Sequence, residues 1–184
     1  MTTAGVLHCD SCTAASLPSG AGAWTVEPDG VHCPGCRPYR ILVTGGRDWD
    51  DRDHVHRVLA GLVTAPVPVL VHGDQGRYRD GRLVGLDRVA ARVAEELGWR
   101  TEPHPAWWDG PCSPSCPPGH RRRRGFGTYC PTAGPRRNRA MAELGADLCI
   151  VWPGGRGTAD MVRRARAAGI PVRPAVELAG QPAA

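Results

Sequence analysis

The chain has 184 residues, 41% of them hydrophobic, and a formal net charge of +5. This length suits one compact domain with an appendage, and no apolar run approaches the roughly 20 residues that a membrane-spanning helix needs. All 23 Lys and Arg positions are arginine, so the sequence excludes Schiff-base lysines and the lysine of the Walker-type phosphate loop.

The expected compartment and the excess of arginine both bear on which ligands the chain can bind. Its first residues, MTTAGVLHCDSC, lack the basic start and apolar stretch of a secretory signal, so we expect a cytoplasmic protein. Its eight cysteines are then not expected to form disulfides. Composition leaves two explanations of the arginine excess open, a genomic bias and an anionic ligand.

Residues 1–38 predict a small zinc-ribbon-like module. Two CxxC pairs bracket a segment in which Trp24, Val26 and Val31 alternate around a Pro-Asp-Gly turn, a pattern typical of a short hairpin. Because so short a segment buries little core, we expect a metal ion to hold it together. Two CxxC turns supply the four thiolates of a structural zinc site, and free redox cysteines are the alternative. The expected ligands are Cys9, Cys12, Cys33 and Cys36.

From residue 39 onward strands and helices alternate. Short apolar runs predict strands, and apolar residues three and four positions apart predict helices. Strands are expected at 40–46, 67–74, 100–105, 147–152 and 170–175, helices at 48–63, 85–99, 134–146 and 158–169, a polar loop at 74–84 and a disordered tail at 177–184. The alternation predicts the α/β class over residues 39–176, with a Rossmann-like parallel sheet covered by helices on both faces.

Residues 107–133 interrupt this pattern as a loop insertion. A loop so long and so rich in proline and glycine is costly to order without support. Its cysteines and histidine occur at intervals that suit a second structural zinc site, and a loop with free thiols is the alternative. The expected ligands are Cys112, Cys116, His120 and Cys130.

Two glycine-rich turns follow predicted strands, where open parallel sheets bind their ligands. In the first, Gly45 and Gly46 let the backbone approach a ligand and Arg47 offers a planar fork to an oxyanion, although an ordinary tight turn explains it equally. The second, VWPGGRGTADMV (151–162), predicts a helix N-terminus that binds an anion.

The second turn has a specific expected geometry. Gly154, Gly155 and Gly157 remove side chains from it, and Thr158 is predicted as the helix N-cap. Asp160 then falls at the second helical position, where it either complements the helix dipole or serves the ligand.

Two clusters of arginine complete the sequence pattern. Arg136 and Arg137, followed by Asn138, lie at the start of the third helix, where positive charge opposes the dipole; a nearby anion or a solvated basic face explains them. The run Arg121–Arg124 either lines the mouth of the ligand site or contacts nucleic-acid phosphates, although no helix-turn-helix or base-stacking array accompanies it.

Together, the segments ILVTGGRDW, GLDRVAA, HPAWWDG, AGPRRNRAM and DLCIVWPGGRGTADMVRRARAAGIPV resemble the SLOG superfamily, in its YspA-like branch, over residues 39–175. The resemblance implies a Rossmann-like fold, a nucleotide or nucleotide-derived ligand and a homodimer. The superfamily includes DNA-processing protein A, sensor domains of antiphage systems and the LOG phosphoribohydrolases, which release a base from a nucleoside 5′-monophosphate.

The LOG enzymes carry a PGGxGTxxE-type loop with an arginine before it. Residues 153–158 resemble that loop, Asp160 falls at its first glutamate, and Arg137 falls at the arginine of the LOG Arg-Lys pair. Asp160 is one methylene shorter than glutamate, and Asn138 replaces the lysine. The CxxC pairs and the insertion lie outside the shared core, and the insertion resembles one in some actinobacterial and phage members.

Two hypotheses follow. The first is a nucleotide-binding SLOG domain, acting as a phosphoribohydrolase-like N-glycosidase or as a sensor. In it the two glycine turns hold the phosphate, Arg137 clamps the phosphate or ribose, and Asp160 stabilises charge on the sugar. Asp87 binds a ribose hydroxyl or caps its helix. The second hypothesis is a zinc-ribbon adaptor that binds nucleic acid or a protein partner.

Overall fold

The computed structural model describes residues 6–16, 24–27, 30–62 and 68–179. Its centre is a sheet of five parallel strands in the order β13–β12–β5–β6–β9. Their bounds are β5 Arg40–Thr44, β6 Val69–His72, β9 Arg100–Pro103, β12 Leu148–Val151 and β13 Val172–Pro174. The chain adds β6 and β9 on one side of β5 and then β12 and β13 on the other. The strand order therefore reverses between β5 and β12, and that switch point is where open α/β sheets bind ligands.

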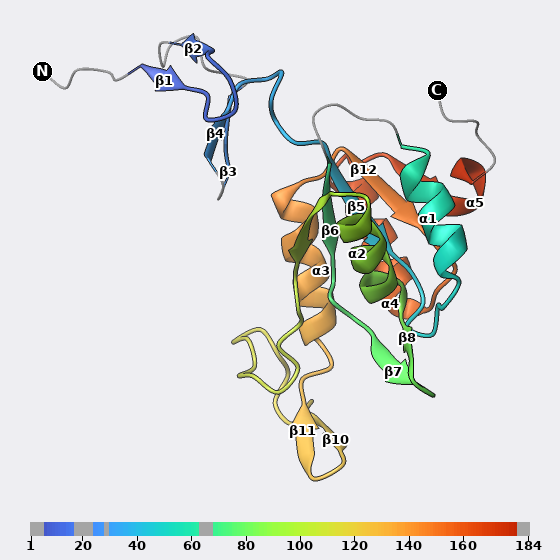
Figure 1. The fold of residues 1–184 in the computed structure, drawn as a ribbon. Helices are drawn as coiled ribbons and strands as arrows, with labels where there is room; N and C mark the ends of the chain where they lie inside the picture. The colour runs from blue at the N-terminus through green and yellow to red at the C-terminus, as the bar shows by residue number, and fades with distance from the viewer. Residues whose placement is uncertain (1–5, 17–23, 28–29, 63–67, 180–184) are drawn as a thin grey trace, which may run out of the picture.

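Helices cover both faces of this sheet (Figure 1). Helices α1 (Arg52–Ala60) and α2 (Leu86–Glu96) and the short α5 (Ala175–Leu178) pack on one face, and α3 (Ala133–Leu144) and α4 (Arg156–Ala167) pack on the other. Strand residues alternate between the two cores: Ile41 and Val43 pack with α1 and α2, whereas Leu42 packs with α3 and α4. The α/β fold class expected from the sequence is confirmed, and burial on both faces is the reason that its strands are continuous apolar runs.

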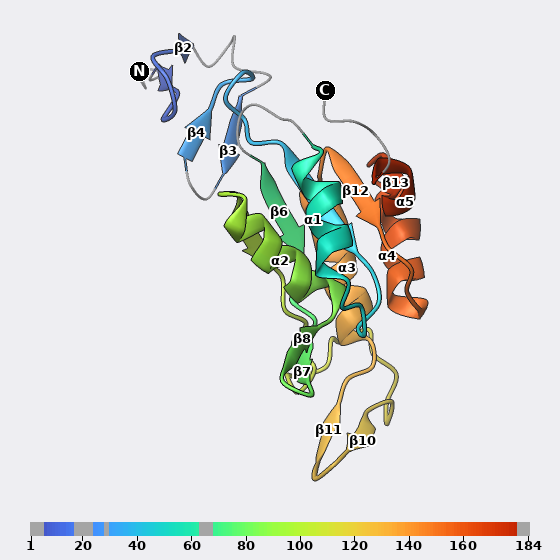
Figure 2. The same ribbon diagram turned by 45° about the vertical axis from the view of Figure 1, so that its right-hand side comes forward.

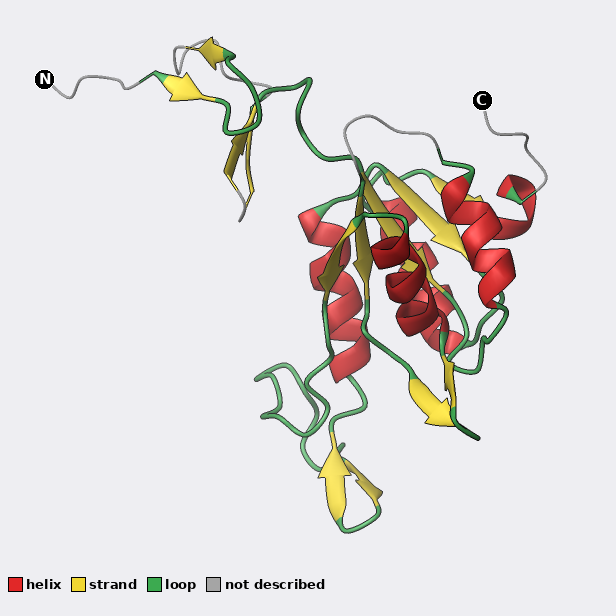
Figure 3. Ribbon diagram, viewed as in Figure 1, coloured by secondary structure: helices red, strands yellow, loops and turns green. Residues whose placement is uncertain are grey.

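The N-terminal segment and the insertion lie at opposite ends of the sheet (Figure 2). The N-terminal segment has two small antiparallel pairs, β1 (Leu7–His8) with β2 (Ala15–Ser16) and β3 (Thr25–Glu27) with β4 (Gly30–His32). The latter is the expected hairpin, although residues 28 and 29 of its turn lie outside the described residues. The insertion is mostly loop, with the single hairpin β10 (Arg122–Arg124) and β11 (Gly127–Tyr129) in it (Figure 3).

Two local expectations were wrong. Part of the predicted loop at 74–84 forms an antiparallel hairpin, β7 (Arg77–Arg79) with β8 (Arg82–Val84). Asp80 and Gly81 adopt φ angles of 51° and 75°, the two-residue turn that matches the twist of paired strands. Helix α4 starts at Arg156 with Gly155 as its cap, not at residue 158, because Gly155 takes the extended backbone of a cap residue.

The C-terminal end of the chain also differs from the sequence prediction. Residues 175–178 form α5, and Leu178 is buried against the first core, where a strand end and then a disordered tail were expected. Residues 180–184 of that predicted tail, and residues 63 and 67 at the ends of a predicted helix and strand, lie outside the described residues. Within the described ranges, no helix has the length and apolar character required to cross a membrane.

Candidate ligand site and metal centres

The two glycine turns meet at the switch point of the sheet. The Gly46 N–H donates to the Pro153 carbonyl over 2.9 Å, and the Thr158 hydroxyl donates to the Gly45 carbonyl over 3.0 Å. A Cβ on Gly154 would lie 2.2 Å from Thr158 Oγ1 and 2.9 Å from the Gly45 carbonyl carbon. Gly154 is thus required by close packing. Thr158 is not the predicted N-cap: it lies inside α4, and its hydroxyl joins the helix to the first turn.

Gly155 and Gly157 are different, because the fold does not require glycine there. A Cβ at either position would meet no atom within 4 Å, and neither residue has a positive φ. Gly157 lies in the first turn of α4, where glycine costs up to about 1 kcal/mol relative to alanine. No side chain in the described part of the chain caps α4, and a Cβ at Gly155 or Gly157 would enter open space, so the first N–H groups of the helix are left without a side-chain partner there. This is the arrangement that binds anions at a helix N-terminus.

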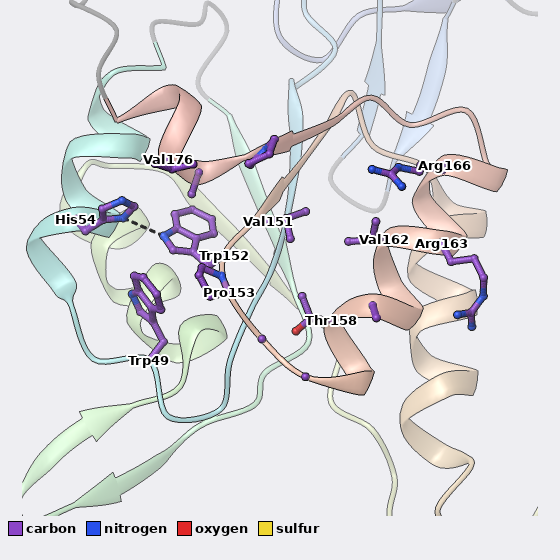
Figure 4. Close-up of a pocket in the computed structure, with 15 residues that line it drawn as sticks. Trp49, His54, Val151, Trp152, Pro153, Thr158, Val162, Arg163, Arg166 and Val176 are labelled. Atoms are coloured by element: carbon purple, nitrogen blue, oxygen red, sulfur yellow. Dashed lines mark hydrogen bonds between the residues drawn. The ribbon is translucent and has the colours of Figure 1, made fainter.

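A cavity of about 880 Å³ opens beside this helix start (Figure 4). Its volume is within the range of small-molecule sites. Gly154, Gly155 and Thr158 belong to its wall, so the helix start and the cavity form one continuous surface. The remaining wall residues come from α1 and the loop before it, the end of β12, the outer face of α4 and the start of α5, and they are Trp49, His54, Val151, Trp152, Pro153, Ala159, Val162, Arg163, Arg166, Pro174, Ala175 and Val176.

The sequence analysis missed this wall. Trp152 is 1% exposed and its indole N–H donates to His54 Nδ1 over 3.0 Å, while Trp49 packs edge-on against the same imidazole. Two signals were available: Trp49 and Trp152 each follow closely on a strand end, and Val162 and Arg166 are four residues apart on one helix face. Arg166 is exposed at the cavity, and the described residues give it no ion pair.

Asp160 is held inside the α3–α4 interface. Its carboxylate accepts hydrogen bonds from Arg164 Nε over 2.8 Å, from Asn138 Nδ2 over 3.0 Å and from Arg163. Burial opposes ionisation, but the hydrogen bonds from Arg164 and Asn138 outweigh it and lower the pKa of Asp160. Asn138, 7% exposed, also donates to the Gly157 carbonyl over 3.2 Å. Asp160 and Asn138 therefore join α3 to the first turns of α4.

Arg137 and Asp87 belong to a second polar group beyond the ends of β6 and β9. Arg137 donates to the carbonyls of Gly73 and His104, the latter over 2.8 Å. Asp87, 8% exposed, accepts the Gln75 N–H over 3.1 Å, so it fixes the loop after β6; the described chain shows no side-chain cap on α2. Burial raises the pKa of Asp87 to about 6 and lowers the pKa of His72 in the same group to about 4.

The other two predicted arginines contact the insertion. The Arg47 guanidinium lies over the Trp108 ring, 5.5 Å from its centroid, and Arg136 donates to Cys116 Sγ over 3.5 Å. The predicted residues thus divide into a group at the start of α4 and a group around Arg137. The first consists of Gly45, Gly46, Asn138, Gly154, Gly155, Gly157, Thr158 and Asp160, and the second of Arg47, Asp87, Arg136 and Arg137.

The first cysteine group has the geometry of a metal centre. The ligand atoms of Cys9, Cys12, Cys33 and Cys36 lie within 4.8 Å of one another. Cys12 and Cys33 Sγ are 3.7 Å apart, much too far for a disulfide and close to the roughly 3.8 Å between thiolates on one tetrahedral zinc ion. The Cys33 N–H lowers the pKa of Cys9 to about 6, whereas the crowded thiol of Cys12 raises that of Cys36 to about 12.

The second group has three thiols and an imidazole. The ligand atoms of Cys112, Cys116, His120 and Cys130 also lie within 4.8 Å of one another. His120 Nε2 is 3.5 Å from Cys112 Sγ and 3.2 Å from Cys130 Sγ, while Nδ1 donates to the Pro117 carbonyl over 2.6 Å. That second hydrogen bond orients the ring and leaves Nε2 free for a metal ion. Both predicted cysteine groups can therefore hold a metal ion.

Comparison with known proteins finds similarity both in sequence and in structure. No family model matches the chain. The Gene 61 protein of Mycobacterium phage D29 is 33% identical over 148 residues, which cover 72% of this chain and 93% of that protein.

DNA processing protein A (DprA) of Streptococcus pneumoniae superposes with a TM-score of 0.53 at 20% identity over 76% of this chain, which spans half the length of DprA. This likeness shows the fold alone, which is Rossmann-like. The molybdenum cofactor binding protein of the phototrophic bacterium Rippkaea orientalis gives a TM-score of 0.46 at 20% identity, over 75% of this chain and 76% of that one.

Proposed function

The chain belongs to the family of the Gene 61 protein of mycobacteriophage D29, and we propose that it binds a nucleotide or nucleotide-derived ligand at the switch point between β5 and β12. The observation that carries the proposal is the pair Gly155 and Gly157, whose side-chain space is empty although nothing in the fold demands glycine. They leave the N–H groups at the start of α4 open to a phosphate.

The adjoining cavity accounts for the rest of such a ligand. Besides Gly154 and Gly155, its lining includes Val151, Val162, Trp49 and Val176. Its wall is predominantly apolar and aromatic, as suits a sugar edge and a planar base, and Arg166 adds a positive charge at its edge. One nucleotide thus places its phosphate at the helix start and its base in the cavity.

We propose a binding role in preference to LOG-type N-glycosidase activity. Hydrolysis of that type needs a carboxylate that faces the sugar. Both oxygens of Asp160 instead accept hydrogen bonds from Arg163, Arg164 and Asn138. Arg137, the other residue that the LOG resemblance implicates, donates to backbone carbonyls beyond β6 and β9. A sensor or carrier of a nucleotide fits these contacts better than a hydrolase.

The proposal is tested with two substitutions at one position. In Gly155→Asp, the new carboxylate caps α4 and places a negative charge where the phosphate would bind. Gly155→Ser caps the helix without charge and is the matched control. By titration calorimetry we expect the wild type to bind nucleoside 5′-monophosphates, Gly155→Ser to bind them more weakly because its hydroxyl competes for the same N–H groups, and Gly155→Asp to lose binding. Unchanged affinity in Gly155→Asp would remove the site, and release of free base by the wild type would restore the N-glycosidase hypothesis.

We further propose zinc at both cysteine groups, and residues 1–38 as a module separate from the domain at 39–176. Thiolate-rich tetrahedral sets favour zinc among the common divalent ions. The N-terminal segment supports the module proposal because Cys9 and Cys33 are among its few buried apolar residues. Metal analysis of the purified chain should give two zinc ions per chain; one ion or none would contradict the proposal.

A further inference from the structure

Two hairpins project beyond the end of the sheet at which β5, β6 and β12 finish (Figures 1 and 2). They are β7–β8, at residues 77–84, and β10–β11, at residues 122–129. Each carries a large exposed ring: Phe126 is fully exposed in the two-residue loop of β10–β11, and Tyr78 is 68% exposed on β7. Isolated apolar residues on a surface are common, but here the rings accompany arginines.

Arg121, which precedes β10, and the three arginines of β10 have different roles. Arg121 is part of the insertion's framework, because it donates to the carbonyls of Gly110 and Thr128 over 2.8 Å each. Arg124 lies over the Tyr129 ring, 5.4 Å from its centroid. Arg122 and Arg123 are exposed, and within the described residues the structure gives neither an acidic partner. Two guanidinium groups of the hairpin that carries Phe126 therefore remain available to a phosphate.

The β7–β8 hairpin contributes less charge. Arg77 pairs with Asp48, and Arg79 pairs with Asp50 over 3.2 Å, so their charges are largely balanced within the protein. Arg82 is exposed and has no acidic partner among the described residues. This hairpin therefore supplies mainly the Tyr78 ring, and the β10–β11 hairpin supplies most of the unbalanced positive charge.

A stack of side chains joins β10–β11 to the loop that follows β5. Arg47, which follows β5, lies over Trp108; the rings of Trp108 and Tyr129 are 6.2 Å apart; and Arg124 lies over Tyr129. Cys130 follows β11 directly and is fully buried in the second metal centre. The hairpin is therefore fixed at its base, while its loop is free to meet a partner.

We propose that these two hairpins form a binding surface for single-stranded nucleic acid, separate from the nucleotide site. Unpaired guanidinium groups bind phosphates of any sequence, and exposed aromatic rings stack on bases. Stacking requires bases whose faces are open, which a duplex does not offer. The rings lie at or near the hairpin loops, where an unpaired strand can lie across them. The surface recognises a strand with little sequence preference.

Fluorescence anisotropy with a labelled single-stranded oligonucleotide of mixed sequence tests this on the full chain. Phe126→Ala should weaken binding roughly 5- to 100-fold, the usual range for loss of one base-stacking ring. The double variant Arg122→Ser/Arg123→Ser should reduce the dependence of log K on log salt by about 1.4, since each lost phosphate contact on a single strand contributes about 0.7. Arg139→Ser/Arg173→Ser removes two exposed arginines elsewhere and is the control, with no change expected beyond that of net charge.

Four outcomes would overturn the proposal: no binding by the wild type, equal binding of a matched duplex, equal binding of a polyanion such as polyglutamate that has no bases, or full affinity in Phe126→Ala. A saturating nucleoside 5′-monophosphate is included in one arm. Because the hairpins lie outside the cavity, it should not displace the oligonucleotide; displacement would assign the binding to the nucleotide site instead. If the wild type bound the oligonucleotide but no nucleotide, the nucleotide site would be contradicted and this proposal would stand.

Discussion

The two ends of the sheet carry cysteine groups of nearly the same chemistry in very different surroundings. At the amino-terminal end, the group of Cys9, Cys12, Cys33 and Cys36 lies in a segment joined to the domain by the ion pair of Arg37 with Asp147. At the carboxyl-terminal end, Cys130 is three residues from the start of α3, and Thr132 and Arg136 contact the cysteine sulfurs. The two groups offer similar ligands to a metal ion. We therefore expect their influence on ligand binding to depend on how close each group lies to the carboxyl ends of the strands.

The first prediction concerns the removal of each cysteine group in turn. Cys116→Ser/Cys130→Ser should lose one metal ion and weaken nucleotide binding by about 10-fold or more, which corresponds to about 1.4 kcal/mol. The reason is that α3 begins at this centre and holds the first turn of α4 through Asn138. Cys9→Ser/Cys12→Ser should lose one metal ion and keep the wild-type affinity. Metal analysis and calorimetry on the same samples measure both, and equal losses of affinity would end the distinction between the two ends.

A second prediction concerns the buried charges at the carboxyl-terminal end. Asp87 has a pKa of about 6 in the folded chain, above its ordinary value of 3.8, so it adds stability at low pH that is lost as the pH rises through 6. His72 has a pKa of about 4, below its ordinary 6.5, so it adds stability at neutral pH that is lost as the pH falls from 6.5 toward 4. The two effects oppose each other between about pH 4 and pH 6.

Replacing Asp87 removes the stability gain at low pH that offsets the loss caused by His72. In Asp87→Asn, the free energy of unfolding should fall between pH 7 and pH 4 by roughly 3 kcal/mol more than in the wild type. Urea unfolding at several pH values measures the difference. Asp53→Asn, on an exposed side chain of α1, is the control and should follow the wild-type curve. Parallel curves for Asp87→Asn and the wild type would contradict the raised pKa of Asp87.

A third prediction tests the link between the insertion and α4. Asn138→Ala removes the hydrogen bonds to the Gly157 carbonyl and to Asp160, and also the one that Asn138 Oδ1 accepts from Arg137 Nε over 3.0 Å. Because Asn138 is buried, we expect the free energy of unfolding to fall by about 1–3 kcal/mol and nucleotide affinity to fall with it. Exposed Arg139→Ser on the same helix should change neither. Loss of stability with full affinity would show that α3 supports α4 without shaping the ligand site.

Much of the fold follows from local patterns in the sequence. Ile41, Leu42 and Val43 are consecutive and apolar because the strand is buried on both faces, and that run can be read without a structure. The cysteine spacings likewise predict which sulfurs meet, since each CxxC turn brings its own pair together. The turn at Asp80 and Gly81 was also readable, but the polar composition around it favoured a loop.

The candidate site was less predictable, because side-chain direction depends on packing between distant segments. The arginines at the start of α3 indicated either a nearby anion or a solvated basic face, yet Arg137 donates to the carbonyls of Gly73 and His104, which are far from it in sequence. The sequence left Asp160 either complementing the helix dipole or serving the ligand, and in the structure it accepts hydrogen bonds from Arg163, Arg164 and, across the α3–α4 interface, Asn138. The cavity combines Trp49, Trp152 and Val176, and only the packing of α1 and α5 around the end of β12 brings these together.

The smallest expected effect is at the amino-terminal contact, where Arg37 is about one-third exposed. Arg37→Ala should change the free energy of unfolding by at most about 1 kcal/mol and leave nucleotide and oligonucleotide binding unchanged, because partly exposed ion pairs contribute little. Asp147→Ala should cost more, since Asp147 also accepts the Arg40 N–H over 2.8 Å at the start of β5. Thermal unfolding and the two binding assays compare them. A loss of binding in Arg37→Ala would show that the N-terminal segment acts on the distant end of the sheet, so position would no longer separate the two metal centres.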